Sequence, residues 1–210
     1  MTVPARPGLN VLSAYVPGEA KLPGYANPIR LASNENALGA SPKALEAFSK
    51  VASQLHRYPD PSARLLRETL AKKFQLDGNR IVCGAGSDEL IELIAQGYAG
   101  PGDEVIYSQY GFMKYAITII SVGAKPVMVP ERNFTAQVDD ILAAVNARTK
   151  IIFLANPNNP TGSMLAASDI RRLHQGLPPY VLLVLDAAYA DYVDDKTYEA
   201  GYQLASNSEN

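Results

Sequence analysis

Three apolar runs of the chain are each followed by residues of types that bind ligands. The run Arg80–Cys83 is followed by Gly84-Ala85-Gly86-Ser87-Asp88-Glu89. Glycines let the backbone turn sharply, and a helix that begins there presents free N–H groups to an anion such as a phosphate group. A glycine-rich turn that holds no ligand has the same residue pattern. The dinucleotide-binding fingerprint fails, because Glu89 stands where that fingerprint needs a third glycine.

The other two runs end in amide and carboxylate side chains. Lys150–Ala155 is followed by Asn156-Pro157-Asn158-Asn159-Pro160-Thr161-Gly162, and Val181–Leu185 by Asp186-Ala187-Ala188-Tyr189. Asn, Pro and Gly are also the ordinary residues of a loop. However, a rigid loop that aims amides from the end of a strand indicates a bound ligand. A carboxylate at the end of a buried strand is costly unless it is hydrogen-bonded or paired with a cation, so Asp186 favours a cationic ligand.

The elements that position these segments alternate between strand and helix from Asn79 onward. Apolar patterning predicts strands at Arg80–Cys83, Glu104–Ser108, Lys125–Pro130, Lys150–Ala155 and Val181–Leu185, with helices at Ser87–Tyr98, Gly111–Val122, Val138–Asn146 and Ser168–Gln175. Within Gly111–Val122, the residues Ile117, Thr118, Ile119 and Ile120 also permit a strand. Near-continuous apolar strands indicate burial on both faces of a parallel sheet. The fold class is therefore α/β, a mostly parallel sheet with helices on both faces, in which ligands bind beyond the carboxyl ends of the strands.

The first 78 residues have a different character. Pro and Gly are frequent at the start, which predicts an extended N-terminal arm over residues 1–40. A helical segment over residues 41–78 follows, with helices at Pro42–Leu55 and Ala63–Phe74 separated by a rigid turn that holds two prolines. We expect this segment to pack on the α/β domain, residues 79–210, or on a partner subunit.

Composition excludes several classes of protein. The chain has 210 residues, of which 47% are hydrophobic, and a net charge of -2, so neither disorder nor a nucleic-acid partner is expected. Two His and one Cys cannot form a Cys/His metal cluster, so no metal is expected. We expect no membrane span and no signal peptide, because no apolar run approaches about 18 residues. The expected location is cytoplasmic.

Taken together, the motifs resemble the fold-type-I pyridoxal-phosphate aminotransferases. The matching pieces run in the family's order from Leu31 to Tyr189: Leu31-Ala32-Ser33-Asn34-Glu35-Asn36, Arg57-Tyr58-Pro59-Asp60, Gly86-Ser87-Asp88-Glu89, Tyr110-Gly111, Asn156–Gly162 and Asp186-Ala187-Ala188-Tyr189. The Asn-Pro-x-Asn-Pro-Thr-Gly stretch followed by Asp-x-x-Tyr is the most specific part. The resemblance implies that residues 79–210 are an incomplete large domain that binds pyridoxal 5'-phosphate.

The resemblance also implies roles for individual residues. Ser87 and Asp88 would bind the cofactor phosphate, and Tyr110 would stack on the pyridine ring, although an exposed loop tyrosine is the alternative for Tyr110. Asn159 and Tyr189 would hydrogen-bond the phenolic oxygen of the ring. Asp186 would pair with the pyridinium nitrogen and keep it protonated. The family also predicts a cis peptide bond between Asn159 and Pro160.

Other implied features concern a partner subunit and the rest of the family's chain. Tyr58 would reach the phosphate group of a neighbouring subunit's cofactor in a homodimer, unless it only stiffens its proline turn. Asn34, and less specifically Tyr25, would line the substrate pocket. The Schiff-base lysine of the family lies in a Ser-Lys segment that would come beyond Asn210, so no catalytic residue is assigned in this chain. The family's small C-terminal domain is likewise expected to be absent from it.

The implied activity is transamination. The Asn34-Glu35-Asn36 and Arg57–Asp60 elements favour the branch of the family that exchanges an amine between histidinol phosphate or imidazole-acetol phosphate and glutamate or 2-oxoglutarate, in histidine biosynthesis. One alternative is a related enzyme of other specificity: an aromatic or branched-chain aminotransferase, or a phospho-amino-acid decarboxylase. Another is a non-catalytic ligand sensor with the same fold. A nicotinamide-dependent dehydrogenase is disfavoured by the failed fingerprint.

Overall fold

The computed structural model describes residues 12, 22–29 and 33–210, and these form two compact units with a boundary between Ser62 and Ala63. This boundary separates the two helices that the predicted segment 41–78 kept together. The first unit contains α1 (Pro42–Val51), which is extended by a 3-10 turn, Ala52–Gln54, and has Pro42 in its first turn. Proline is favoured there because its missing N–H would have no partner in the helix.

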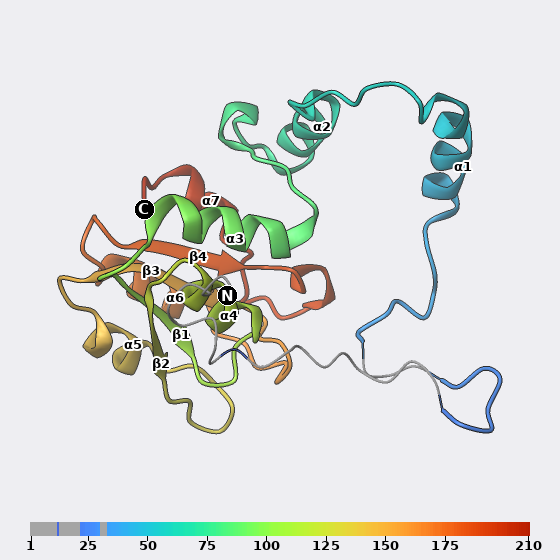
Figure 1. Ribbon diagram of the computed structural model, residues 1–210. Coiled ribbons are helices and arrows are strands. Elements are labelled where there is room, and N and C mark those ends of the chain that lie inside the picture. Colours follow the sequence, from blue (N-terminus) through green and yellow to red (C-terminus); the bar gives the residue numbers. More distant parts are fainter. Residues whose placement is uncertain (1–11, 13–21, 30–32) are drawn as a thin grey trace, which may run out of the picture. The chain divides into compact units, whose positions relative to one another are not determined.

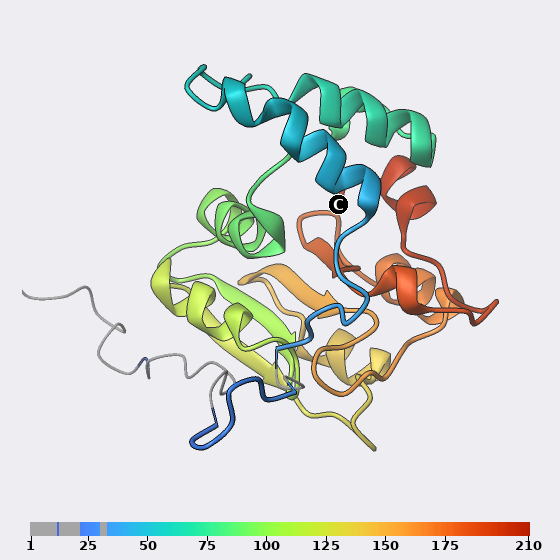
Figure 2. The same cartoon turned by 90° about the vertical axis from the view of Figure 1, so that its right-hand side faces the viewer.

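The second unit is an α/β domain (Figures 1 and 2). Its helices are α2 (Arg64–Phe74), α3 (Gly86–Tyr98), α4 (Lys114–Ser121), α5 (Val138–Ala144), α6 (Ala167–Gln175) and α7 (Tyr202–Ser206), and its strands are β1 (Glu104–Ser108), β2 (Lys125–Val129), β3 (Thr149–Ala155) and β4 (Leu182–Asp186). The four strands are parallel in the order β2-β1-β3-β4. The predicted class, a mostly parallel sheet with flanking helices, is confirmed.

Each face of the sheet packs against one pair of helices. Ile91 of α3 and Ile119 of α4 pack with Val105, Ile151 and Phe153 on one face. The other face is covered by α5 and α6, with a core that includes Ile106, Val138, Ile141, Ile152, Leu154, Ile170 and Leu173. Successive residues of β3 therefore point into different cores, which explains why this central strand is apolar almost throughout.

One predicted strand is wrong. Residues 81–84 belong to neither a strand nor a helix, and a 3-10 turn, Gly78–Arg80, precedes them. The backbone of Ile81 is extended, but no strand within the described part of the chain pairs with this segment, and Val82 is exposed. Apolar patterning detects the extended conformation, whereas a strand also needs a partner for its N–H and C=O groups.

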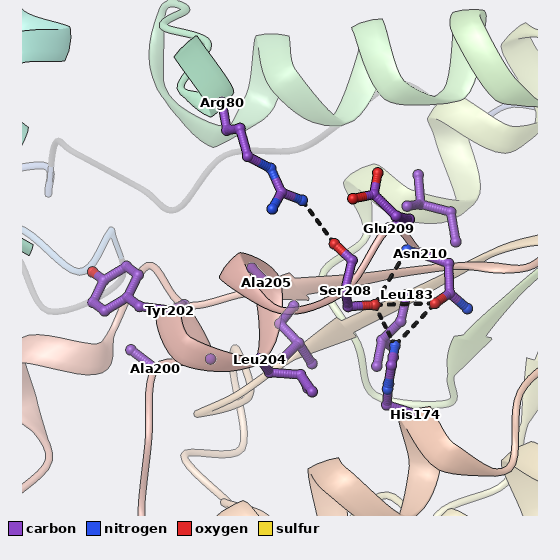
Figure 3. Close-up of a pocket in the computed structure, with 14 residues that line it drawn as sticks. Arg80, His174, Leu183, Ala200, Tyr202, Leu204, Ala205, Ser208, Glu209 and Asn210 are labelled. Carbon is purple, nitrogen blue, oxygen red and sulfur yellow. Dashed lines mark hydrogen bonds between the residues drawn. The ribbon is translucent and has the colours of Figure 1, made fainter. Parts of the chain in front are cut away.

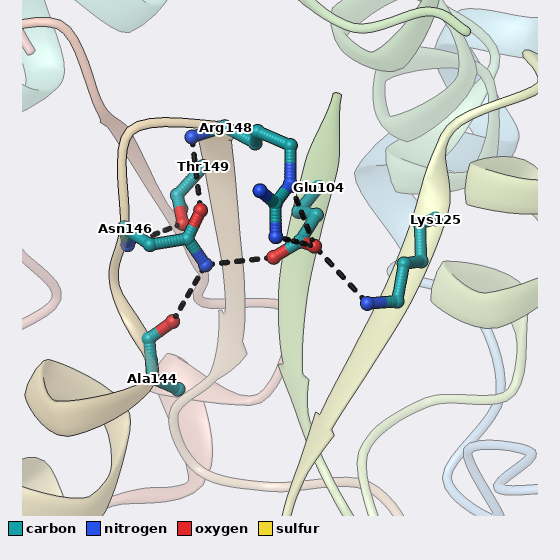
Figure 4. A network of polar contacts seen from close by, with 6 residues as sticks. All are labelled: Glu104, Lys125, Ala144, Asn146, Arg148 and Thr149. Atoms are coloured by element: carbon teal, nitrogen blue, oxygen red, sulfur yellow. Dashed lines mark hydrogen bonds and ion pairs between the residues drawn. The ribbon is translucent and has the colours of Figure 1, made fainter. Parts of the chain in front are cut away.

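A buried carboxylate organises the amino edge of the sheet (Figure 4). Glu104, the first residue of β1, accepts hydrogen bonds from Asn146 at 2.7 Å, from the Arg148 guanidinium at 2.8 Å and from Lys125 Nζ at 3.1 Å. These donors hold the pKa of Glu104 at about 2, below its ordinary value of 4.5, with Asn146 contributing most. The network joins the starts of β1, β2 and β3, at the edge opposite their carboxyl ends.

Within the described residues, we find no helix with the length and apolar character that crossing a membrane requires.

Candidate active site

The carboxyl ends of β3 and β4 bring the two most specific motifs together. Ala155 lies opposite Asp186 in the parallel register, and the N–H of Asn156 donates to the carbonyl oxygen of Asp186 at 2.9 Å. The segment after β3 therefore begins beside the segment after β4. This juxtaposition follows from parallel pairing, since strands that run the same way end at the same edge.

Side-chain hydrogen bonds fix the loop after β3. Asn156 is buried; its Oδ1 accepts from the N–H of Leu165 at 2.8 Å, and its Nδ2 donates to the carbonyl oxygen of the same residue at 3.1 Å. Asn158 Nδ2 donates to the carbonyl oxygen of Tyr110 at 3.1 Å, which ties this loop to the segment after β1. The predicted cis bond Asn159–Pro160 is confirmed, and Asn156–Pro157 is also cis.

A small cavity at this edge collects most of the predicted cofactor residues. It is lined by Ser87, Asp88, Phe112, Ala155, Asn159, Asp186, Ala188 and Tyr189. Five of the residues named from the sequence thus meet around one space, although they come from segments about 100 residues apart. The cavity volume is about 100 Å³, below the roughly 300 Å³ at which small-molecule pockets usually begin. The described residues therefore enclose only part of a ligand.

The N-terminus of α3 forms one wall and is suited to a phosphate group. Ser87 and Asp88 lie in its first turn, where the N–H groups have no partner inside the helix. Ala85 is the N-cap residue and its side chain makes no capping hydrogen bond, while its own N–H donates to Glu89 Oε2 at 2.6 Å. The N–H groups and the positive end of the helix dipole together favour an anion. Lys114 Nζ lies 3.8 Å from Asp88 and also contacts Glu92, which partly offsets the acidic charge of this turn.

Asp186 forms another wall and is held by two donors. Its Oδ2 accepts a hydrogen bond from the hydroxyl of Tyr115 at 2.9 Å, and its Oδ1 accepts from the N–H of Ala188 at 3.2 Å. Tyr115 is fully buried. Burial, and then the charge and hydrogen bond of Asp186, raise the pKa of Tyr115 far above its ordinary value of 10, so its hydroxyl remains a donor at any physiological pH.

The structure places Phe112 rather than Tyr110 on the wall of the cavity. The ring of Tyr110 packs against Phe134 instead, with ring centroids 5.3 Å apart, and Tyr110 is 39% exposed. Its N–H donates to Glu131, so the backbone that carries it is fixed. Within the described part of the chain, the aromatic residues that line the cavity are Phe112 and Tyr189, and the stacking role of Tyr110 stays a prediction.

Three of the predicted residues belong to the other compact unit. Tyr58, Asn34 and Tyr25 all precede the boundary at Ser62, and Tyr58 and Tyr25 are exposed there. The roles predicted for these residues at the cofactor and at the substrate stay predictions.

Sequence reasoning missed Phe112 and Tyr115. Phe112 lies two residues before α4 and Tyr115 is the second residue of that helix, so no helical spacing in the sequence pointed to the two residues as a pair. Their rings pack edge to face, with centroids 5.9 Å apart. Apolar patterning assigned this segment to the core, which is correct for Tyr115, but the pattern does not show that the Tyr115 hydroxyl reaches Asp186.

A second, larger hollow lies against β4 and does not contain the predicted residues (Figure 3). Its volume is about 370 Å³, and its lining includes Arg80, His174, Leu183, Leu204 and Asn210. His174 Nε2 lies 2.8 Å from Ser208 Oγ and 3.0 Å from Asn210 Oδ1, while Arg80 donates to the carbonyl oxygens of Ser206 and Ser208. These contacts hold the last described residues against the domain. The larger of the two cavities therefore contains none of the predicted site residues, and the size of a cavity does not identify the candidate site.

The parallel sheet and the cavity at its carboxyl edge define an α/β protein whose candidate ligand site lies beyond the ends of its strands. Comparison with known proteins identifies the family: the model for "Aminotransferase class I and II" matches residues 26–209. The chain belongs to this aminotransferase family.

Individual relatives agree with this assignment. The chain is 52% identical to the histidinol-phosphate aminotransferase of Rhodospirillum centenum over 97% of its own length and 56% of that protein, and 52% identical to that of Paramagnetospirillum magneticum over 100% and 58%. The crystal structure of histidinol-phosphate aminotransferase from Sinorhizobium meliloti in complex with pyridoxal-5'-phosphate superposes with a TM-score of 0.76 at 30% identity, covering 80% of this chain and 46% of that one. The chain thus spans about half the length of the curated relatives it matches.

Proposed function

We propose that this chain supplies the cofactor-binding face of a pyridoxal-phosphate-dependent aminotransferase that exchanges an amine between histidinol phosphate and 2-oxoglutarate in histidine biosynthesis. The observation that carries the proposal is the cavity that Asn159, Asp186 and Tyr189 line together with Ser87 and Asp88 of the first turn of α3. The choice of substrate is supported by relatives with 52% identity that bear this activity in their names.

The residues around the cavity match the chemical groups of pyridoxal phosphate. The first turn of α3, with Ser87 and Asp88, would hold the phosphate group. Asn159 and Tyr189 carry an amide and a hydroxyl that suit the phenolic oxygen, and Phe112 offers the aromatic face for the ring. Asp186 provides the anion for the ring nitrogen. The residues present therefore fit the cofactor.

The chemistry supplied by bound pyridoxal phosphate is an electron sink for the carbanion that forms when the substrate Cα loses its proton. Asp186 would keep the ring nitrogen protonated, because a carboxylate within hydrogen-bonding distance favours the charged form of its partner. Asn159 and Tyr189 would orient the ring, while Phe112 would exclude water from one of its faces. All described lysines lie outside the lining of the cavity, and the family's lysine beyond Asn210 stays a prediction.

Assembly and location belong to the same proposal. A homodimer that brings Tyr58 of one subunit to the cofactor of the other would give the first compact unit a function. A mutant that replaces Tyr58 with Phe in the whole protein should then bind the cofactor more weakly than the wild type. The cytoplasmic location is proposed from the biosynthetic role and is tested by cell fractionation.

The test uses the whole protein, including any coding sequence that follows Asn210. Purified protein loaded with pyridoxal phosphate is mixed with single amino donors, and the absorbance of the bound cofactor is followed. We expect histidinol phosphate and glutamate to change the absorbance fastest. A response confined to aromatic or branched-chain amino acids would indicate an aminotransferase of another specificity, and release of CO₂ would indicate a decarboxylase. Cofactor binding without a response to any donor would indicate a sensor.

A further inference from the structure

Tyr115 is the most tightly held polar group beside the cavity. It is fully buried, and its ring stacks on Phe153 of β3 with centroids 5.1 Å apart and planes 5° apart. On another side Phe112 packs edge-on against it at 5.9 Å. A ring enclosed in this way has one available orientation, and that orientation directs its hydroxyl to Asp186 Oδ2 at 2.9 Å.

The hydroxyl can act only as a fixed neutral donor. Because the phenol stays protonated in this environment, it does not exchange a proton with Asp186. A buried hydroxyl that donates to a carboxylate makes a stronger hydrogen bond than one between two neutral groups. The bond therefore restricts the rotation of the carboxylate.

The carboxylate keeps acceptor capacity after both of its observed contacts. A carboxylate offers about four lone-pair positions, and Tyr115 and the N–H of Ala188 occupy one each. Asp186 also lines the cavity, whereas Tyr115 lies behind it. Tyr115 therefore holds a side chain that lines the cavity, and it can affect a ligand there only through Asp186.

We propose that Tyr115 is a positioning residue that holds Asp186 as an oriented anion for the ring nitrogen of the cofactor. This inference rests on the proposed function, since it assumes a cofactor whose ring nitrogen meets Asp186. It adds a residue that the sequence motifs do not contain and assigns a function to a tyrosine that otherwise belongs to the core.

The experiment compares Tyr115→Phe, Asp186→Ala and the double variant in the whole protein. The Tyr115→Phe change keeps the ring and its stacking while removing only the hydroxyl. Tyr107→Phe is the matched control, because Tyr107 packs against the same core and its hydroxyl makes no hydrogen bond within the described part of the chain. The probe is pyridoxamine 5'-phosphate, which binds without a covalent bond, and its dissociation constant is measured by calorimetry.

Two further measurements separate a positioning role from a purely structural one. Urea unfolding of the cofactor-free variants gives the coupling between Tyr115 and Asp186 in the absence of any ligand. The ¹⁵N chemical shift of a probe labelled at the ring nitrogen reports whether that nitrogen is protonated. Neither readout depends on turnover.

We expect Tyr115→Phe to weaken binding of the probe about tenfold, as the loss of one hydrogen bond to a charged group implies. The ¹⁵N shift should move toward the unprotonated value, and the effect of Tyr115→Phe on binding should disappear when Asp186 is already alanine. Tyr107→Phe should leave both readouts unchanged. Coupling in unfolding without any change in binding or in the ¹⁵N shift would show that Tyr115 is only structural and overturn the inference. Failure of the wild type to bind the probe would instead overturn the proposed function, and the inference with it.

Discussion

Replacing Glu104 with Gln tests the buried network at the amino edge of the sheet. The side chain of Glu104 is 4% exposed, and the change removes its charge while keeping its size. Its pKa lies at about 2 in the folded protein against an ordinary 4.5, a difference worth at most about 3 kcal/mol at neutral pH. Lys125 and Arg148 are 69% and 63% exposed, so solvent screens their attraction. We therefore expect Glu104→Gln to lower the free energy of unfolding by about 1–2 kcal/mol.

The pH dependence gives this prediction its sign. A carboxylate whose pKa is depressed by folding stabilises the protein above its unfolded value, here 4.5, and loses that contribution as the pH falls toward 2. Urea midpoints of the cofactor-free whole protein should thus differ most between wild type and variant above pH 5, and the difference should shrink by more than half at pH 3. The control is Glu46→Gln, which breaks an exposed ion pair with Lys50 and should change little at any pH. A difference that stays constant from pH 7 to pH 3 would refute the reasoning.

Four further substitutions test the site, the loop after β3 and the packing of the helices. Phe112→Ala should weaken binding of pyridoxamine phosphate by about tenfold, because an aromatic contact and buried area are lost, whereas Tyr110→Ala should have a smaller effect. The reverse order in calorimetry would support the stacking role predicted for Tyr110. Asn156→Ala removes the side chain that pairs with the N–H and the carbonyl oxygen of Leu165, and it should lower the free energy of unfolding in urea by about 2–3 kcal/mol. An unchanged free energy would mean that this side chain does not hold the loop. Gly176→Ala would place a methyl group 2.8 Å from the end of the Leu142 side chain; because that end can move, we expect a loss of about 1 kcal/mol, measured as a lower urea midpoint.

The sequence by itself determined the class of fold and predicted most of the residues that line the cavity. Near-continuous apolar runs can be satisfied only between two layers of helices, so the alternation of such runs with amphipathic segments specifies a parallel sheet. Once the sheet is parallel, the segments after its strands share one edge, and Asn159, Asp186 and Tyr189 must meet there with the start of α3. Local motif and topology together were sufficient for these residues.

Other features were decided only by tertiary structure, because they depend on which groups become neighbours. Ile81 is extended but remains unpaired, since no partner strand lies beside it within the described residues. Phe112 rather than Tyr110 lines the cavity, and the carbonyl oxygen of Tyr110 is held by the side chain of Asn158, 48 residues away. The hydrogen bond between Tyr115 and Asp186 spans 71 residues, and no local pattern encodes a contact of that separation. Burial and pairing are properties of the packed molecule, so a tyrosine that reads as core in the sequence becomes a donor to the site only when the sheet and α4 are in place.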